Sequence, residues 1–552
     1  MASEQAKDKH YLADELLLQI FSLHQLPSAA TIGRERYEVI NVPRGAIAQD
    51  GPVVNYDDND LHTGACTHKH DEWKAQLRTL SAITRTNRRF RELASPILYR
   101  VYPGQTIANP KSFLRTIKAP QVSDLNAARF VKEIVIDPWD GLNTPKSAQQ
   151  HVQSLGPQLA LVEKLSDAAK QWNDETHVAL LLFYCTNAEV LDLTGPGAFH
   201  TEGALYTLFQ QLRRLGPNTL ARNNEEQAAA RNMPMDLPMR RVKKLFLHHA
   251  EHHYIRKLDG LEPMIRLPAV ESVTVYRFWN SAATALQAFQ HLEELNIWRC
   301  SFKSRDLLAA LKLCAELRSL TIISAGCTSV LGRLMPEKDH PDLAKLGKVI
   351  REKHKKLRKL RLDDREIDAS HPTKLGSFKT GPDLEELALN EACLGCYDSQ
   401  QRTEPTVEAT ETATLARMPL VEMLPSSLQS LIIFRANHWW HEAERGPQAG
   451  EYARDGLVFR FDAINTKIFD LIQNGRYHMP ELQSIHIDTP MAFAHDVEQF
   501  GWTCQQIVGD SKLERPSIVA DSLMKPAEKR QWEATQQMRA SKPSLVLRRV
   551  GL

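Results

Sequence analysis

The sequence predicts an α/β protein in two parts: a short all-α module at the N-terminus, and a long repeat solenoid of parallel strands with helices behind them. Two observations support this prediction. Apolar residues recur at helical spacing near the N-terminus, and from residue 131 onward a six-residue pattern, apolar-x-x-apolar-x-apolar, recurs ten times. With 552 residues, the chain is long enough for three or four domains or for one long array.

The N-terminal module is predicted from two amphipathic segments, residues 12–26 and a second stretch that begins near Trp73. Each places its apolar residues on one face of a helix: Leu12, Leu16, Ile20 and Leu23 in the first, and Leu77, Leu80 and Ile83 in the second. Amphipathic spacing alone is also typical of an ordinary pair of helices in a bundle.

The order of the residues is more specific than their spacing. The first segment reads Leu-x-x-Glu-Leu-Leu-x-x-Ile-Phe, and the second reads Leu-x-x-Ile-x-Arg-x-x-Arg-x-Phe-x-x-Leu-x-x-Pro-x-Leu-Tyr-Arg. Together, over residues 12–27 and 73–102, they resemble the F-box as it occurs in fungal proteins. The resemblance implies that a cluster of apolar residues faces a Skp-type adaptor or supports that surface: Leu12, Leu16, Ile20, Phe21, Leu80, Ile83 and Phe90.

The module departs from the F-box pattern in two places. Ala13 stands where the family usually has a proline, and proline would pre-set the first helical turn. Residues 28–72 separate the two halves where a short loop is usual, and we predict a mobile insertion there. The module with its insertion is predicted to span residues 1–103.

The ten copies of the repeat pattern run from Val131-Ile134-Ile136 to Leu482-Ile485-Ile487, at intervals of 22 to 57 residues. The shorter intervals match the 20–29-residue period of leucine-rich repeats, and helical patterns at 304–313 and 341–352 fall between copies. The pattern resembles the divergent leucine-rich repeats found behind fungal F-boxes. We predict a solenoid over residues 104–500 and a C-terminal cap or mobile tail over 501–552; unrelated core strands are the alternative.

Strand alternation predicts which side chains face outward on the concave wall of such a solenoid. Aromatic residues and arginine dominate protein-binding hot spots, so the outward-facing ones are the candidate substrate-binding residues. The alternative is that inserted loops cover them. The candidates are Phe246, His248, Tyr276, Trp298, Arg361 and Phe434.

Composition narrows the possible partners and compartments. The net charge is only +2, which makes nucleic acid an unlikely partner. Eight scattered cysteines do not form a disulfide framework and fit a reducing compartment. The N-terminus has no signal-peptide pattern, and the longest apolar run, residues 178–184, is too short to span a membrane. We therefore expect a cytoplasmic or nuclear protein that is not bound to a membrane.

The sequence gives only weak signals for a metal site or for a charged docking segment. Cys393 and Cys396 form a lone Cys-x-x-Cys, Cys66-Thr67-His68-Lys69-His70 lies in the insertion, and a histidine cluster spans residues 248–253. We predict no metal and no other cofactor. The basic stretch 345–361 is predicted to be a solvated helix face, with a nuclear localisation signal or a dock for an acidic partner as the alternative.

Phosphate-binding loops, nucleophile elbows and zinc-protease motifs do not occur in the sequence, so we expect no enzyme activity. The resemblance implies the substrate-recognition subunit of a cullin–RING ubiquitin ligase, in which the F-box binds the Skp-type adaptor and the solenoid binds a protein substrate. Two alternatives remain open. One is an interaction scaffold whose helices cap the solenoid, and the other is a metal-dependent enzyme that uses the histidine cluster.

Overall fold

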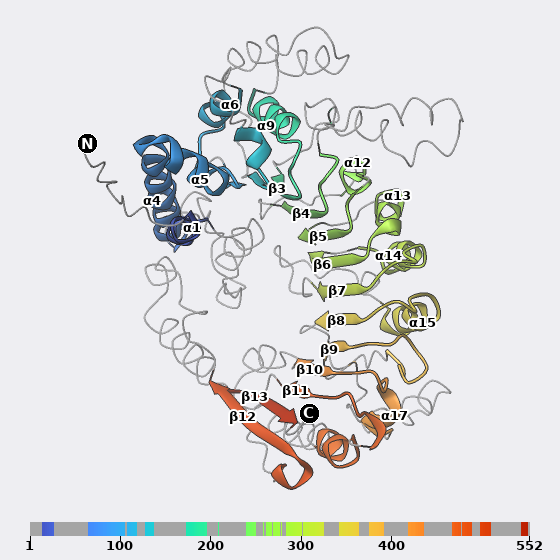
Figure 1. Ribbon diagram of the computed structural model, residues 1–552. Coiled ribbons are helices and arrows are strands. Elements are labelled where there is room, and N and C mark those ends of the chain that lie inside the picture. Colours follow the sequence, from blue (N-terminus) through green and yellow to red (C-terminus); the bar gives the residue numbers. More distant parts are fainter. Residues whose placement is uncertain are drawn as a thin grey trace, which may run out of the picture. The chain divides into compact units, whose positions relative to one another are not determined.

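The fold comes from a computed structural model (Figure 1), which describes a set of ranges within the chain. These are residues 14–26, 65–104, 107–118, 127–136, 173–195, 208, 239–249, 258, 261–267, 269–276, 278, 283–300, 302–324, 342–363, 375–390, 393, 418–434, 466–475, 477–487, 497–508 and 543–549. The described residues form two compact units that divide within strand β4 (Lys244–His249): the first reaches Phe246 and includes Leu267–Val270, and the second holds the rest from Leu247 onward.

The described residues of the N-terminal module form three helices: α1 (Asp14–Ser22), α4 (Ala65–Thr86) and α5 (Arg88–Leu98). Asn87 caps α5, since its side chain accepts a hydrogen bond of 2.8 Å from the Phe90 amide. The prediction that the insertion reaches residue 72 is wrong, because α4 begins at Ala65 and its first two turns are polar. The rest of the predicted insertion lies outside the described residues.

The same unit continues directly into a parallel sheet. Strand β1 (Val101–Tyr102) pairs with β2 (Glu133–Ile136), and β2 pairs with β3 (Val190–Gly195). Helices α6 (Pro110–Lys118) and α9 (Asn173–Tyr184) belong to this unit, with a short 3₁₀ turn, η2 (Ala127–Phe130), before β2. Strand β1 thus precedes the boundary predicted at residue 103.

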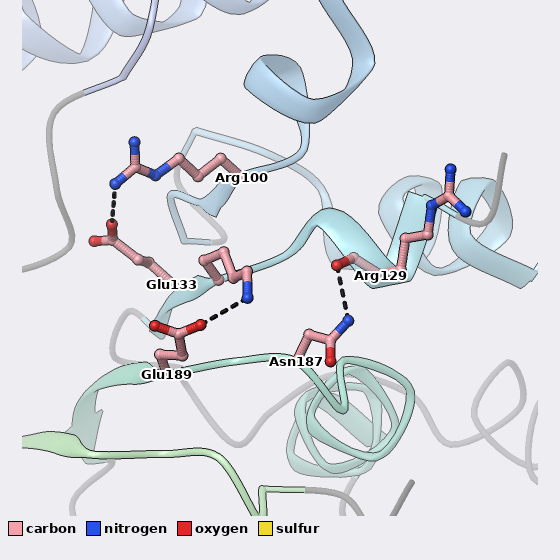
Figure 2. Close-up of polar contacts among 6 residues, drawn as sticks. Arg100, Arg129, Glu133, Asn187 and Glu189 are labelled. Carbon is pink, nitrogen blue, oxygen red and sulfur yellow. Dashed lines mark hydrogen bonds and ion pairs between the residues drawn. The ribbon is translucent and has the colours of Figure 1, made fainter. Parts of the chain in front are cut away.

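Polar contacts join the first three strands where they begin (Figure 2). Arg100 and Glu133 form an ion pair at 3.5 Å, and Lys132 and Glu189 form one at 2.6 Å. The Asn187 amide donates a hydrogen bond of 2.9 Å to the Arg129 carbonyl. These contacts are partly exposed, so each adds at most about 1 kcal/mol, but together they fix how one strand follows the next.

The second unit repeats the arrangement of strand and helix. Its strands are β5 (Ser272–Tyr276), β6 (Glu294–Cys300), β7 (Ser319–Ser324), β8 (Lys359–Asp363), β9 (Glu386–Asn390), β10 (Ser430–Phe434) and β11 (Ser484–Ile487). Its helices include α12 (Glu262–Ile265), α13 (Ala283–Leu286), α14 (Ser304–Leu311), α15 (Leu343–Lys353) and α17 (Leu420–Met423), with the 3₁₀ turn η4 (Gln287–His291) after α13, and residues 466–475 are helical as well. Figure 1 shows α12 to α15 stacked along one side of β5 to β8.

The ten predicted copies of the repeat pattern correspond to the ten strands β2 to β11, and the helices expected at 304–313 and 341–352 are α14 and α15. Strands β1 to β11 follow one another across the sheet in sequence order. Over the described ranges the fold is therefore α/β, and β1 to β11 form an eleven-stranded parallel sheet that is not closed. Neighbouring strands pair at equivalent pattern positions, for example Leu295 with Leu320 and Leu320 with Leu360.

One backbone contact recurs between successive repeats. The carbonyl of the residue after the first apolar position accepts hydrogen bonds from two amides of the next repeat. The Glu293 carbonyl accepts from Arg318 and Ser319 at 2.7 and 3.0 Å, and the Arg318 carbonyl accepts from Arg358 and Lys359 at 2.8 and 3.0 Å. The same contact is made by the Arg100 carbonyl, which accepts from the Lys132 and Glu133 amides, so β1 stands to β2 as each of these strands stands to the next.

A second recurring feature, found in nine of the ten copies, is a buried residue three positions before the first apolar residue; the copy that begins at Leu384 lacks it. The carbonyl of the buried residue accepts a hydrogen bond from the amide three residues later, which turns the chain into the strand. These side chains continue the apolar core beneath the sheet, and the set contains one histidine. The residues are Ala128, Cys185, Met239, Leu267, Phe289, Cys314, His354, Pro425 and Met479.

The C-terminal segment extends the sheet by two strands, β12 (Trp502–Val508) and β13 (Pro543–Arg549). β13 pairs antiparallel with β11 on one side and antiparallel with β12 on the other, so the order is β11-β13-β12. The described residues 502–508 and 543–549 are therefore part of the sheet.

Candidate functional site

Helix α1 is held by apolar contacts on one of its faces. Leu17 and Phe21 are buried against Leu80 of α4 and Ala94 of α5. The rings of Phe21 and Phe90 meet edge to face, with their centroids 5.6 Å apart. This cluster sets the rotation of α1 about its own axis, and with it the residues that α1 leaves outside.

An ion pair fixes the N-terminal end of the same helix. The Arg89 guanidinium of α5 donates from Nε to Asp14 Oδ1 at 2.8 Å. Asp14 lies in the first turn of α1, where a carboxylate also complements the helix dipole. Both side chains are more than a third exposed, so the pair orients α1 more than it stabilises the fold.

The opposite face of α1 is apolar and open to solvent. Leu16 is 44% exposed, Ile20 is 40% exposed, and Leu23, in the turn after the helix, is 78% exposed. They are spaced four and three residues apart, which aligns them in one stripe, and Leu18, 38% exposed, flanks it. The described residues contain two other large apolar side chains this open, Leu313 and Tyr477. Such a concentration on one short helix is typical of a docking surface.

The seven predicted adaptor residues therefore separate into three groups. Leu16 and Ile20 face solvent, Phe21 and Leu80 are core residues, and Leu12 lies outside the described residues. Ile83 and Phe90 are partly buried and pack against the core cluster. Leu18 and Leu23 were not among the predicted site residues, although the helical spacing had placed Leu23 on the same face as Leu16 and Ile20.

The predicted wall residues lie on the strands expected for them, with unequal exposure. His248 and Tyr276 are only 5% and 3% exposed, with their ring centroids 6.1 Å apart, so the expectation that they offer open contact area is wrong. Thr274 is buried as well, so both faces of β5 are covered and alternation alone does not give accessibility. Phe246, Trp298 and Arg361 are half-buried. For Phe434 the structure describes the strand backbone and not the side chain.

The more open part of this face lies on β6 to β8. In register, Trp298 stands beside Ile323, and Asn296 stands beside Thr321, which stands beside Arg361. The Asn296 amide donates to Glu294 Oε1 at 2.9 Å and to Thr274 Oγ1 at 3.3 Å, so it is already engaged within the sheet. This patch combines aromatic, aliphatic and hydrogen-bonding groups.

The basic stretch 345–361 is largely paired within the protein. Lys356 pairs with Glu316, Arg358 with Glu385, and Lys359 with Glu386, at 2.5, 2.6 and 2.6 Å. On α15, Lys345 pairs with Asp342 and Lys348 with Glu352. Arg351 donates to the Leu375 carbonyl at 2.5 Å, and its pKa is lowered by burial. These contacts favour the interpretation of a solvated helix face over a dock for an acidic partner.

The described residues contain no group of three or more metal-ligating side chains. The side chains of Cys66, His68 and His70, residues 250–253 and Cys396 lie outside the described part of the chain. Burial raises the pKa of Cys185 and of Cys314 to about 12, so neither thiol is an available nucleophile at neutral pH.

Comparison with the models of known protein families finds no match, and a search of curated proteins finds none either. Among the helices that the structure describes, none is long and apolar enough to cross a membrane.

Proposed function

We propose that this protein is the substrate-recognition subunit of a cullin–RING ubiquitin ligase, in which α1 docks on a Skp-type adaptor and the sheet carries a protein substrate. One observation supports the first half above all others: the open apolar stripe of Leu16, Ile20 and Leu23 on a helix whose other face is fixed in a core. The stripe coincides with the segment that resembles the F-box.

The proposed mechanism is positioning. The receptor holds the substrate so that its lysines lie close to a ubiquitin-loaded enzyme elsewhere in the complex, which raises their effective concentration without bond chemistry in this chain. The half-open patch on β6 to β8, with Trp298 and Ile323 side by side, is the proposed substrate contact. Cytoplasm or nucleus is the compartment in which such a complex works.

The adaptor half is tested by co-purifying the full chain with a Skp-type adaptor. The double variant Leu16→Asp/Ile20→Asp places two charges in the stripe and touches no core residue, so affinity should fall by at least about a hundredfold. The matched control is Leu313→Asp/Tyr477→Asp, the same chemical change at the two open apolar residues away from α1. Undiminished binding by the first variant, or equal losses in both, would contradict the proposed docking surface.

A second candidate function is an interaction scaffold without a ligase role, in which the helices cap the sheet. The observation in its favour is a core shared by helix and strand: Trp73 of α4 is buried with Leu26, Val101 of β1 and Val135 of β2. Absence of adaptor binding by the wild-type chain, with the Leu16 stripe intact, would favour this alternative.

A further inference from the structure

Strand β12 begins like the strand of a repeat. The Phe500 amide donates to the Val497 carbonyl at 3.1 Å, just as the Leu482 amide donates to the Met479 carbonyl at 3.2 Å before β11. β12 starts at Trp502, two residues after Phe500, and β11 starts at Ser484, two residues after Leu482. Val497 is buried, as Met479 is at the corresponding position before β11, whereas Phe500 is half-buried where Leu482 is buried.

β12 nevertheless does not take the place of the next repeat strand. β13 runs antiparallel to β11 and to β12, so β12 runs parallel to β11, in the direction of all the earlier strands. The first amide of β11, that of Ser484, donates to the preceding repeat at Gln429. The first amide of β12, that of Trp502, donates instead to Val497 in its own turn, at 3.2 Å. β12 is thus displaced from β11 by one strand, which is about 4.8 Å of extra spacing.

We call the one-strand gap between β11 and β12 the seam. The extended segment β13 fills this seam and pairs with a strand on each side of it. β13 pairs with β11 from Ser484 opposite Arg548 to Ile487 opposite Leu545, and with β12 from Trp502 opposite Arg549 to Val508 opposite Pro543. Backbone pairing of this kind supplies affinity for any extended strand, and alternate positions supply selectivity. Here Leu547 and Leu545 stand opposite Ile485 and Ile487.

We propose that this seam is a binding site for one extended strand, that the chain's own β13 fills it in cis, and that β13 of a second copy of the chain fills it equally well in trans. Exchange of an identical element preserves every contact. Residues 509–542 connect β12 to β13 and, fully extended, span up to roughly 110–120 Å, so their length does not restrict the exchange. A connection of this length gives an effective concentration of order millimolar, so the dilute chain is closed on itself.

The test uses the full chain with a specific protease site substituted at residues 522–528, between the two strands. After folding and cleavage, a fluorescent peptide of residues 541–552 serves as the β13 of a second copy, and its anisotropy reports binding. The cleaved chain should bind one peptide per chain, and the uncleaved chain, whose own strand competes in cis, should bind at least about a hundredfold more weakly. A peptide with Leu545→Asp and Leu547→Asp should also bind at least about a hundredfold more weakly than the natural one.

Three results would overturn the proposal. If the cleaved chain keeps its own strand and takes up no peptide over a day, then β13 is a permanent part of the fold. A cleaved chain that releases the strand and yet binds no peptide has closed the seam, with β12 docked directly on β11. Equal uptake of the natural and the aspartate peptides shows apolar adsorption instead of strand pairing. Circular dichroism before and after cleavage establishes in each case that the rest of the fold is intact.

Discussion

Replacing Trp73 by alanine should loosen the first three strands together with the helices. Trp73 is buried at the point where α4 meets β1 and β2, against Leu26, Val101 and Val135, with Leu77, Ile107 and Val190 packed around them. Burying a tryptophan removes up to about 250 Å² from water, or about 6 kcal/mol at about 25 cal/mol per Å². Measured Trp→Ala costs in protein cores are about 3–5 kcal/mol, which is the magnitude we expect here.

Hydrogen exchange on the full chain measures this effect region by region. In the Trp73→Ala variant, the opening free energy of the amides in α4 and β1 to β3, including Lys132 and Glu133 bonded to the Arg100 carbonyl, should fall by about 3–5 kcal/mol. Amides of β6 to β8 should keep their protection and serve as the internal reference.

Leu80→Ala is the matched control, because Leu80 lies in the second core cluster, which contains only residues of α1, α4 and α5. It should cost about 2–5 kcal/mol, mainly in the helices. The reasoning would be refuted if Trp73→Ala lowered protection in α4 alone and left β1 to β3 at the wild-type level, because the shared cluster would then not couple the two.

Two further predictions concern the repeats. Burial lowers the pKa of His354 below its ordinary value of 6.5, so the unfolded chain takes up this proton at a higher pH than the folded chain does. The free energy of unfolding should therefore fall as the pH drops below 6.5, by at most about 1.4 kcal/mol per pH unit from this group. In His354→Met, the difference between the free energies of urea unfolding at pH 7.5 and at pH 5.5 should be smaller than in the wild type. A difference equal to that of the wild type would contradict this. At Gly347 of α15 an added Cβ would lie 1.9 Å from the Leu375 carbonyl oxygen, so Gly347→Ala should cost about 1–3 kcal/mol in thermal unfolding. Gly475→Ala, whose nearest atom is 3.6 Å away, should be neutral or stabilising, and similar losses in the two variants would contradict the argument.

The strands of the repeats could be predicted from the sequence because each depends on a local pattern. Leu292, Leu295 and Ile297 show the period that a strand needs, and the same spacing recurs in all ten copies. β1 was not predicted because Gly104 stands where the third apolar residue would be. The first turns of α4 were missed because residues 65–72 are almost entirely polar and carry no apolar period.

For the candidate site, the sequence predicted which residues belong together but not which of them are exposed. Helical spacing placed Leu16, Ile20 and Phe21 on one segment, but their separation into an open face and a core face depends on where α5 packs. Alternation likewise placed Tyr276 on the outward side of its strand and contained no information on what covers that side. The place of β13 had no local signal, since its partners lie 58 or more residues earlier on β11 and across the 509–542 connection on β12.

The paired amides that bind each repeat to the carbonyl of the one before have a consequence for how such a chain can diversify. Since the alignment of each strand is set at its own first residues, the stretch between repeats can lengthen or shorten without shifting any strand, which accounts for intervals from 22 to 57 residues in a sheet of regular register. Substituting one connecting segment for another should therefore change the surface available for binding while the pairing of the strands stays the same. The sheet thus keeps the positions of its strands fixed, while the segments that connect the strands can be exchanged.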